Sequence, residues 1–290
     1  MKFDFFTLGG RFLWEDIYNY RDWIIQRNIR KQKYRLLDPG YIRRDSGSFE
    51  QCKATLLKYI EACELEPLYE DTIIILHGYA RTRNSTAALA NSLKDLPANI
   101  IRINYASLRM GLNFHALMLE QFIKNLDTKG HLFIINVGAA CLLTRKFISN
   151  SENYRAYKIA RILDINPLNS GSDLAELLSK QKGSEQIFGP MLSDIQTKKA
   201  LSLPKLPSEI EHGIIFCPNA LQRISKKIFS NLDSFPFASP PNERTYAQKI
   251  KDIQEKVCCP LRCRDLFDNC IHFVTEGEFL PDDDEDVDKI

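Results

Sequence analysis

The stretch "HLFIINVGAACLLTRKFI", residues 131–148, decides the fold because it joins a buried strand to a helix through a very short turn. The apolar run from His131 to Ile135 predicts a short buried strand, and a helix is expected to begin near Ala139. Gly138 stands at the turn between them. A sharp turn of this kind presents the side chain at its tip, and glycine has none to present. The stretch therefore predicts a strand–turn–helix backbone that could present a reactive side chain but carries none.

Strand-like and helix-like segments alternate on both sides of this stretch. Apolar runs predict strands at 23–28, 33–38, 71–78, 99–105, 160–166 and 212–217. Helical spacing of apolar residues predicts helices at 49–63, 82–96, 113–126, 172–180 and 261–276. This order predicts an α/β fold with a mostly parallel central sheet, helices on both of its faces and an N-terminal hairpin. The strands at 71–78, 99–105 and 131–137 should be neighbours, with 131–137 central.

Residues 1–280 are expected to form a single domain, because neither an internal repeat nor a linker interrupts the alternation. The least regular part, 167–211, is predicted to form a lid over one edge of the sheet. The last ten residues, 281–290, read "PDDDEDVDKI" and have nothing to bury. They are predicted to be a disordered acidic tail.

The balance of charge argues against a nucleic-acid-binding protein. The 290 residues carry a net charge of +2, well short of the strong basic bias that such proteins show. Basic residues do gather in one region, which we interpret as a solvated hairpin, with an anionic membrane or a protein partner as the alternative. They are Arg27, Arg30, Lys31, Lys33, Arg35, Arg43 and Arg44.

The composition favours a cytoplasmic protein. No apolar run approaches the ~20 residues that span a bilayer, so no transmembrane segment is predicted. The opening "MKFDFFTLGG" carries Asp4 within its apolar stretch, which does not suit a signal-peptide core. The eight cysteines of this long chain are interpreted as buried, reduced thiols rather than a disulfide framework.

The stretch "VCCPLRCRDLFDNCIH", residues 257–272, raises the question of a metal site, because it combines four cysteines with His272. Zinc sites need about four converging ligands. Helical spacing instead puts five of these residues on one stripe, and free cysteine behaves as a small apolar residue. The stripe is Cys259, Cys263, Leu266, Cys270 and Phe273. A buried helix face is the better interpretation, and neither a metal nor a cofactor is predicted.

Several stretches together resemble the α/β-hydrolase family, in particular its bacterial lipase-like and esterase-like members. The similarity runs in order along most of the chain, from the N-terminal hairpin to "VTEGEFL". It is carried by "IIILHGYARTRNS", "IRINYASLR", "FIINVGAACLLTR", "ILDINPLNSGSDLAELL", "IFGP" and "LPKLPSEIEHGII". The resemblance implies a serine on the strand-to-helix turn, a histidine, an acid and two backbone N–H groups that bind an oxyanion.

The resemblance places Gly138 at the position of the nucleophile, because "LLTR" matches the helix that follows the turn. That position needs a positive φ, which glycine adopts without strain. Asn136 and Ala140 replace the flanking glycines, and Asn136 is large enough to shift the turn. Cys141 lies near the helix N-terminus but three residues beyond the turn, where its side chain should point away from a pocket. A serine-hydrolase nucleophile is therefore expected to be absent.

The histidine and the acid are also out of place. In the family the histidine precedes the last helix, and the corresponding stretch "KDIQEKVCCPLRCRD", residues 251–265, contains none. Among the five histidines of the chain, His212 and His272 are those that a loop insertion would bring nearer to the site. Asp233 follows the strand that carries the family's acid and is interpreted as a vestigial acid or a solvated loop residue.

The groups that would bind an oxyanion are expected to remain, although the catalytic side chains are lost. By the resemblance, the backbone N–H groups of Tyr79 and Ala139 form an oxyanion hole, which can hold a carboxylate or a phosphate. In the alternative, a neighbouring side chain such as that of Asn136 or Tyr79 fills the turn. We therefore expect an α/β-hydrolase-fold protein that has lost serine-hydrolase activity and binds a small acyl or anionic ligand or a protein partner.

Two other functions remain open from the sequence. The first is an active carboxylic-ester hydrolase or lipase that uses an unrecognised nucleophile together with His212 or His272. The second is a structural or interaction module that uses the basic hairpin or the acidic tail as its contact surface.

Overall fold

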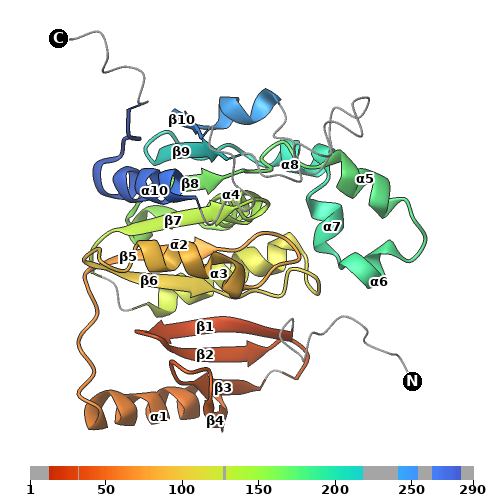
Figure 1. Ribbon diagram of the computed structural model, residues 1–290. Coiled ribbons are helices and arrows are strands. Elements are labelled where there is room, and N and C mark those ends of the chain that lie inside the picture. The colour runs from red at the N-terminus through yellow and green to blue at the C-terminus, as the bar shows by residue number, and fades with distance from the viewer. Residues whose placement is uncertain (1–12, 32, 127–128, 218–240, 254–262, 282–290) are drawn as a thin grey trace, which may run out of the picture.

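The computed structural model describes residues 13–31, 33–126, 129–217, 241–253 and 263–281 (Figure 1). Two sheets lie one above the other in this view, a six-stranded sheet above and a four-stranded sheet below. The predicted acidic tail, Asp233 and part of the cysteine stripe fall outside the described residues.

The larger sheet is parallel throughout, with strand order β10-β9-β8-β7-β5-β6. Its strands are β5 (Asp71–Leu76), β6 (Ala98–Ile103), β7 (Leu132–Val137), β8 (Ile159–Ile165), β9 (Glu211–Phe216) and β10 (Lys249–Asp252). β7 pairs with β5 on one side and β8 on the other, so the strand that leads to the turn is central, as the sequence predicts.

Helices cover both faces of this sheet, which is why its strands are continuous apolar runs. Successive residues of β7 face opposite cores, since Ile134 packs with α3 (Leu112–Asn125) and α4 (Ala140–Asn150). Ile135 packs instead with α2 (Ala87–Ser92) and α10 (Arg264–Glu276). The α/β-hydrolase-like architecture predicted from the sequence is confirmed in this respect.

The predicted helix at 82–96 is shorter than expected. A 3₁₀ turn, η2 (Arg83–Thr86), with Thr82 as its N-cap, precedes α2. Two further 3₁₀ turns are η3 (Tyr154–Tyr157) and η4 (Pro241–Tyr246).

The smaller sheet is antiparallel, with order β1-β2-β3-β4. Its strands are β1 (Trp14–Tyr20), β2 (Trp23–Asn28), β3 (Tyr34–Leu37) and β4 (Arg43–Gly47). The predicted hairpin is β2 with β3, whereas β1 and β4 are too polar to be recognised as strands. Helix α1 (Phe49–Ala62) packs on this sheet through Cys52 and Leu56. Leu57 of this helix is 56% exposed. Cys63 is also exposed, so the prediction that the cysteines are buried is wrong for this residue.

A buried carboxylate joins the two sheets. The Asp16 N–H donates to Asn104 O at 3.0 Å, and the Asn104 N–H donates to Asp16 Oδ2 at 2.7 Å. Arg83 Nη1 lies 3.1 Å from the same Oδ2 and neutralises its charge. β1 is therefore fixed beside β6 by polar contacts rather than by a continuous apolar seam.

Four short helices occupy the predicted lid region at 167–211. They are α5 (Asp173–Ser179), α6 (Ser184–Phe188), α7 (Met191–Asp194) and α8 (Thr197–Ser202). Met191 and Ile195 are buried in the same core as α3 and α4. The single domain over 1–280 and the lid role of 167–211 stay predictions.

Among the helices that the structure describes, none combines the length and the apolar character needed to cross a membrane.

Candidate functional site

The turn after β7 has the backbone geometry that the sequence predicts. β7 ends at Val137, Gly138 has a φ of 59°, and α4 begins at Ala140. The Gly138 N–H donates to Ile165 O on the neighbouring strand β8 at 2.9 Å. A Cβ added to Gly138 would meet no heavy atom within 4 Å, so the space in front of the turn is open. The turn has room for a side chain but carries none.

Asn136 does not fill this space. Its amide group points into the core under α4, where Nδ2 donates to Asp164 Oδ1 at 2.8 Å. The amide oxygen accepts from the Thr144 hydroxyl of α4 at 2.7 Å. Asn136 therefore does not fill the turn, because hydrogen bonds hold its side chain against Asp164 and Thr144, and its effect on the position of the turn stays a prediction.

The loop after β5 carries Tyr79, whose ring also has a partner elsewhere. The Tyr79 hydroxyl donates to Phe188 O at the end of α6. The neighbouring residue Ala80 has a φ of 56° and donates its N–H to Ser107 Oγ at 3.1 Å. Within the described chain, no hydrogen bond uses the backbone N–H of Tyr79 or of Ala139. Their use as an oxyanion hole stays a prediction.

His77 stabilises the loop rather than serving a reaction. Its ring is fully buried and stacks on Tyr105, with the ring centroids 4.2 Å apart. Nε2 accepts from the Tyr105 N–H at 3.3 Å, so Nδ1 carries the proton and donates to Gly78 O at 2.9 Å. Burial lowers the pKa of His77 from 6.5 to about 4. The ring is therefore neutral, and both of its nitrogens are occupied.

His212 lies in a buried polar network that the sequence did not reveal. Its Nε2 is 2.9 Å from Asp164 Oδ2 on the adjacent strand, and its Nδ1 is 2.8 Å from Tyr246 O. Asn136 and Asn169 also donate to the Asp164 carboxylate, at 2.8 and 3.1 Å. Burial opposes ionisation, but the charge of His212 and these hydrogen bonds lower the pKa of Asp164 below its usual value.

This network has an acid and a histidine in contact, as a catalytic triad does, but it has no vacant nitrogen. Both His212 nitrogens face oxygen acceptors, Asp164 Oδ2 and Tyr246 O. A general base must instead keep one nitrogen free to accept the proton of the nucleophile. The Asp164–His212 pair therefore joins strands β8 and β9 and has no free position for a nucleophile.

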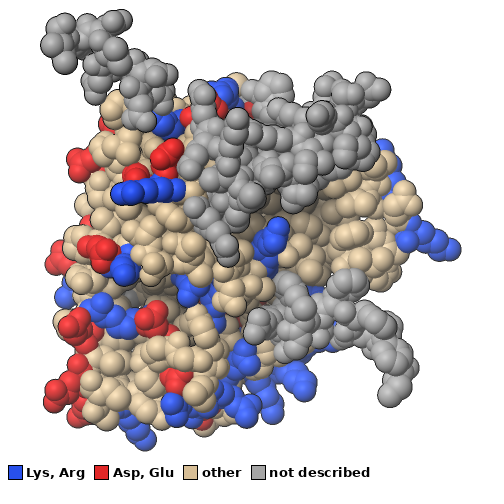
Figure 2. Space-filling view, in the orientation of Figure 1, with Lys and Arg blue, Asp and Glu red and all other residues tan. Residues whose placement is uncertain are grey.

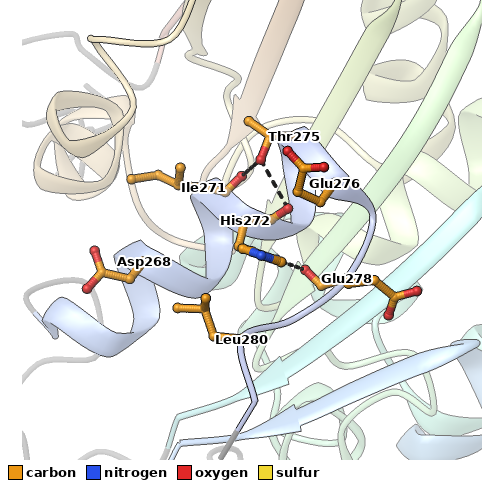
Figure 3. A pocket seen from close by; sticks show the side chains of 7 residues that line it. All are labelled: Asp268, Ile271, His272, Thr275, Glu276, Glu278 and Leu280. Atoms are coloured by element: carbon orange, nitrogen blue, oxygen red, sulfur yellow. Dashed lines mark hydrogen bonds between the residues drawn. The ribbon is translucent and has the colours of Figure 1, made fainter.

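The remaining three histidines are separated from one another. His115 is buried, with Nδ1 3.0 Å from Glu15 Oε1. His131 is exposed beside Asp71. His272 accompanies Asp268, Glu276 and Glu278 at an open groove on α10, and its Nδ1 bonds Glu278 O at 2.8 Å (Figure 3). All five histidines belong to the described chain, and none of their hydrogen-bond partners there is a serine or a cysteine.

Cys141 does not replace the missing serine. It is 1% exposed, and its Sγ accepts from the Leu168 N–H at 3.4 Å. Burial, followed by the charges of Asp164 and Glu243, raises the pKa of its thiol well above the ordinary value. A thiol kept protonated in the core is a poor nucleophile, as the sequence predicts.

The described part of the cysteine stripe is a buried helix face. Cys263, Leu266, Cys270 and Phe273 are all at most 1% exposed. Within the described ranges no three histidine, cysteine or acidic side chains are grouped so that they could hold a metal ion. Asp233, the candidate vestigial acid, lies outside the described residues.

No protein-family model matches the sequence, and no curated protein does. Solved structures are similar to it. The lipase BlEst2 of Bacillus licheniformis in its propeptide form gives a TM-score of 0.51 at 10% identity, over 68% of this chain and 48% of that one. The mature form gives 0.49 at 12% identity, over 64% and 87%. The phospholipase PlaB of Legionella pneumophila in complex with thio-NAD gives 0.46 at 15%, over 56% and 42%.

Identities this low show the fold alone. The likeness to BlEst2, together with the parallel six-stranded sheet and its flanking helices, shows that the chain has the lipase- and esterase-like α/β-hydrolase fold.

Proposed function

We propose that this α/β-hydrolase-fold protein lacks serine-hydrolase chemistry and acts by binding. The observation that carries the proposal is Gly138. It adopts a φ of 59° between a central strand and a helix, with open space in front of it. This is the backbone that presents a nucleophilic serine in the family, and here it presents nothing.

The histidines support the same proposal. A serine needs a base within hydrogen-bond reach to become a nucleophile. His77 and His212 are buried with both ring nitrogens engaged, and His115 is buried beside Glu15. A hydrolase built on this chain would need to release one of them or recruit an exposed one, His131 or His272.

The ligand we propose is a small molecule with an acyl chain or an anionic group. The N–H groups of Tyr79 and Ala139 are without hydrogen bonds in the described chain, and Ala139 caps the N-terminal end of α4. Unpaired N–H groups at a helix N-terminus favour an anion, because the helix dipole and the donors act together. Tyr79, Leu168 and Phe188 are partly buried hydrophobic residues that pack against the core cluster to which Ala139 belongs. The cytoplasmic location stays a prediction.

Decanoate, a carboxylate with an acyl chain, tests this proposal by isothermal titration. We expect saturable binding that Gly138→Leu abolishes, since a leucine side chain would occupy the open space. Gly183→Leu is the matched control. Gly183 also has a positive φ, of 84°, and its added Cβ would meet only the Gln186 side chain at 3.5 Å. If Gly138→Leu still binds decanoate, or if both variants lose decanoate binding equally, the ligand does not bind at the Gly138 turn.

The alternative is an active carboxylic-ester hydrolase, and the observation in its favour is the Asp164–His212 contact at 2.9 Å. It requires His212 to leave the Tyr246 carbonyl. In that case a fluorophosphonate probe would label the wild-type protein but not His212→Ala.

A further inference from the structure

The turn between β3 and β4 presents apolar side chains to solvent in a fixed conformation. Tyr41 and Ile42 are 44% and 58% exposed. Asp38 holds the turn, because its Oδ1 accepts the Ile42 N–H at 2.8 Å and its Oδ2 lies 2.7 Å from Arg44 Nη2. Tyr41 and Ile42 are neighbours in the sequence, so the tip of this turn carries two exposed apolar side chains together.

Arginines surround this turn. The Arg83 guanidinium lies over the Tyr41 ring, 4.5 Å from its centroid, and Arg102 Nη2 donates to the Tyr41 hydroxyl at 3.0 Å. Arg35 is close to both Arg83 and Arg43. Burial is the largest cause that lowers the pKa of Arg35 to about 10. The negative charge of Asp16 raises this pKa, whereas the positive charges of Arg83 and Arg43 lower it. We call Arg35, Tyr41, Ile42, Arg43, Arg83 and Arg102 the arginine patch.

Carboxylates do not balance the charge of the arginine patch. Asp16 pairs with Arg83, and Asp38 pairs with Arg44. Neither Arg43 nor Arg102 has a carboxylate partner among the described residues. Figure 2 shows lysine and arginine gathered along the lower edge of the molecule, over the antiparallel sheet. This edge therefore attracts anions.

We propose that the arginine patch docks the protein on an anionic lipid surface, with Ile42 and Tyr41 entering the interface and the more exposed Arg43 and Arg102 contacting lipid phosphates, while Arg83 is buried against Asp16. Arginines beside exposed apolar side chains favour a lipid surface over a free anion. Free phosphate would satisfy the arginines but leave Ile42 in water. An interface offers anionic headgroups beside an apolar phase, and tyrosine suits the boundary between them. This docking is independent of the ligand proposed at Gly138.

Flotation with phosphatidylcholine vesicles, with and without phosphatidylserine, tests the proposal on the full chain. We expect binding only to the anionic vesicles, and weaker binding at high salt. Arg43→Ala should weaken it about fivefold, and Arg43→Glu by more than that. The matched control is Lys198→Glu, which makes the same charge change at an exposed lysine of α8, at the other end of the molecule (Figure 1). It should have no comparable effect.

A second pair of variants tests whether Ile42 enters the lipid interface. Ile42→Ser should weaken vesicle binding severalfold, whereas Leu201→Ser, at a leucine of α8 that is 52% exposed, should not. Circular dichroism melting checks that all variants fold.

Three results would overturn the proposal. The first is no binding of the wild type to anionic vesicles. The second is an equal effect of Arg43→Glu and Lys198→Glu, which would show that only net charge matters. The third is a combination of two results: Ile42→Ser binds the vesicles as tightly as the wild type, and inorganic phosphate at constant ionic strength displaces the protein from the vesicles. Together they would show that the arginine patch is a phosphate site. If polyglutamate binds as tightly as the vesicles, with no need for Ile42, an acidic protein is the partner instead.

Discussion

His77 makes the stability of the fold depend on pH in a defined window. The pKa of its buried ring is about 4, against 6.5 for a histidine in water. Between these two values the unfolded chain binds a proton at this position and the folded chain does not. Stability contributed by neutral His77 is therefore fully present above about pH 6.5 and is lost as the pH falls toward about 4.

The magnitude follows from the difference between the two pKa values. One pKa unit corresponds to about 1.4 kcal/mol, so the free energy of unfolding should fall by about 2 kcal/mol at pH 5 and by about 3 kcal/mol at pH 4. A loss of this size is a sizeable part of the 5–15 kcal/mol that typically stabilises a domain. It would be felt as a marked drop in melting temperature in mildly acidic buffer.

Urea unfolding of the wild type and of His77→Asn, each at about pH 7.5 and about pH 5, isolates this contribution. Asparagine retains a donor toward Gly78 O but takes up no proton, so the pH dependence of the variant should be smaller by about 2 kcal/mol. His272→Asn makes the same substitution at a partly exposed ring and is measured alongside for comparison. Equal pH dependence in His77→Asn and the wild type would refute the assignment of His77 as a neutral, buried ring.

Two further predictions concern the turn and the network beneath α4. Gly138→Ala should lower the free energy of unfolding by about 1 kcal/mol, because φ is positive while the site has room for the methyl group, and a thermal melt that rises would contradict this. Asp164→Ala should cost about 3–5 kcal/mol, because it leaves His212 buried without its carboxylate. Urea denaturation measures this loss, and one below about 1 kcal/mol would show that the network is not structural.

The parallel sheet could be predicted from the sequence because its physical cause is local. β5 and β7 are buried on both faces, and such strands are continuous apolar runs whatever lies around them. The conformation of Gly138 was predictable for a similar reason, since a strand and a helix separated by so few residues leave one position for a positive φ.

Features that depend on long-range polar pairing could not be predicted. β1 buries Asp16, which would be costly without Arg83 and the backbone of Asn104 as partners. These partners lie far along the chain, so the strand looks like a solvated loop.

The same limit hid the Asp164 network. Asp164 stands inside the largely apolar run "ARILDIN", and this carboxylate was the only signal of the network in the sequence. Its partner His212 is 48 residues away, and only the pairing of β8 with β9 shows that the two meet. Asp233, which the resemblance proposes as the acid, lies outside the described residues, and its role stays a prediction.

Hydrolysis of short and medium acyl p-nitrophenyl esters, measured together with fluorophosphonate labelling, tests the central claim most directly. We predict no turnover above background and no labelling for the wild type. Gly138→Ser should show none either, because triad members act as a unit and both ring nitrogens of His77 and of His212 already have other partners. Labelling of the wild-type protein that is abolished by mutating one serine and one histidine would contradict the loss of serine-hydrolase chemistry, while leaving the fold unchanged.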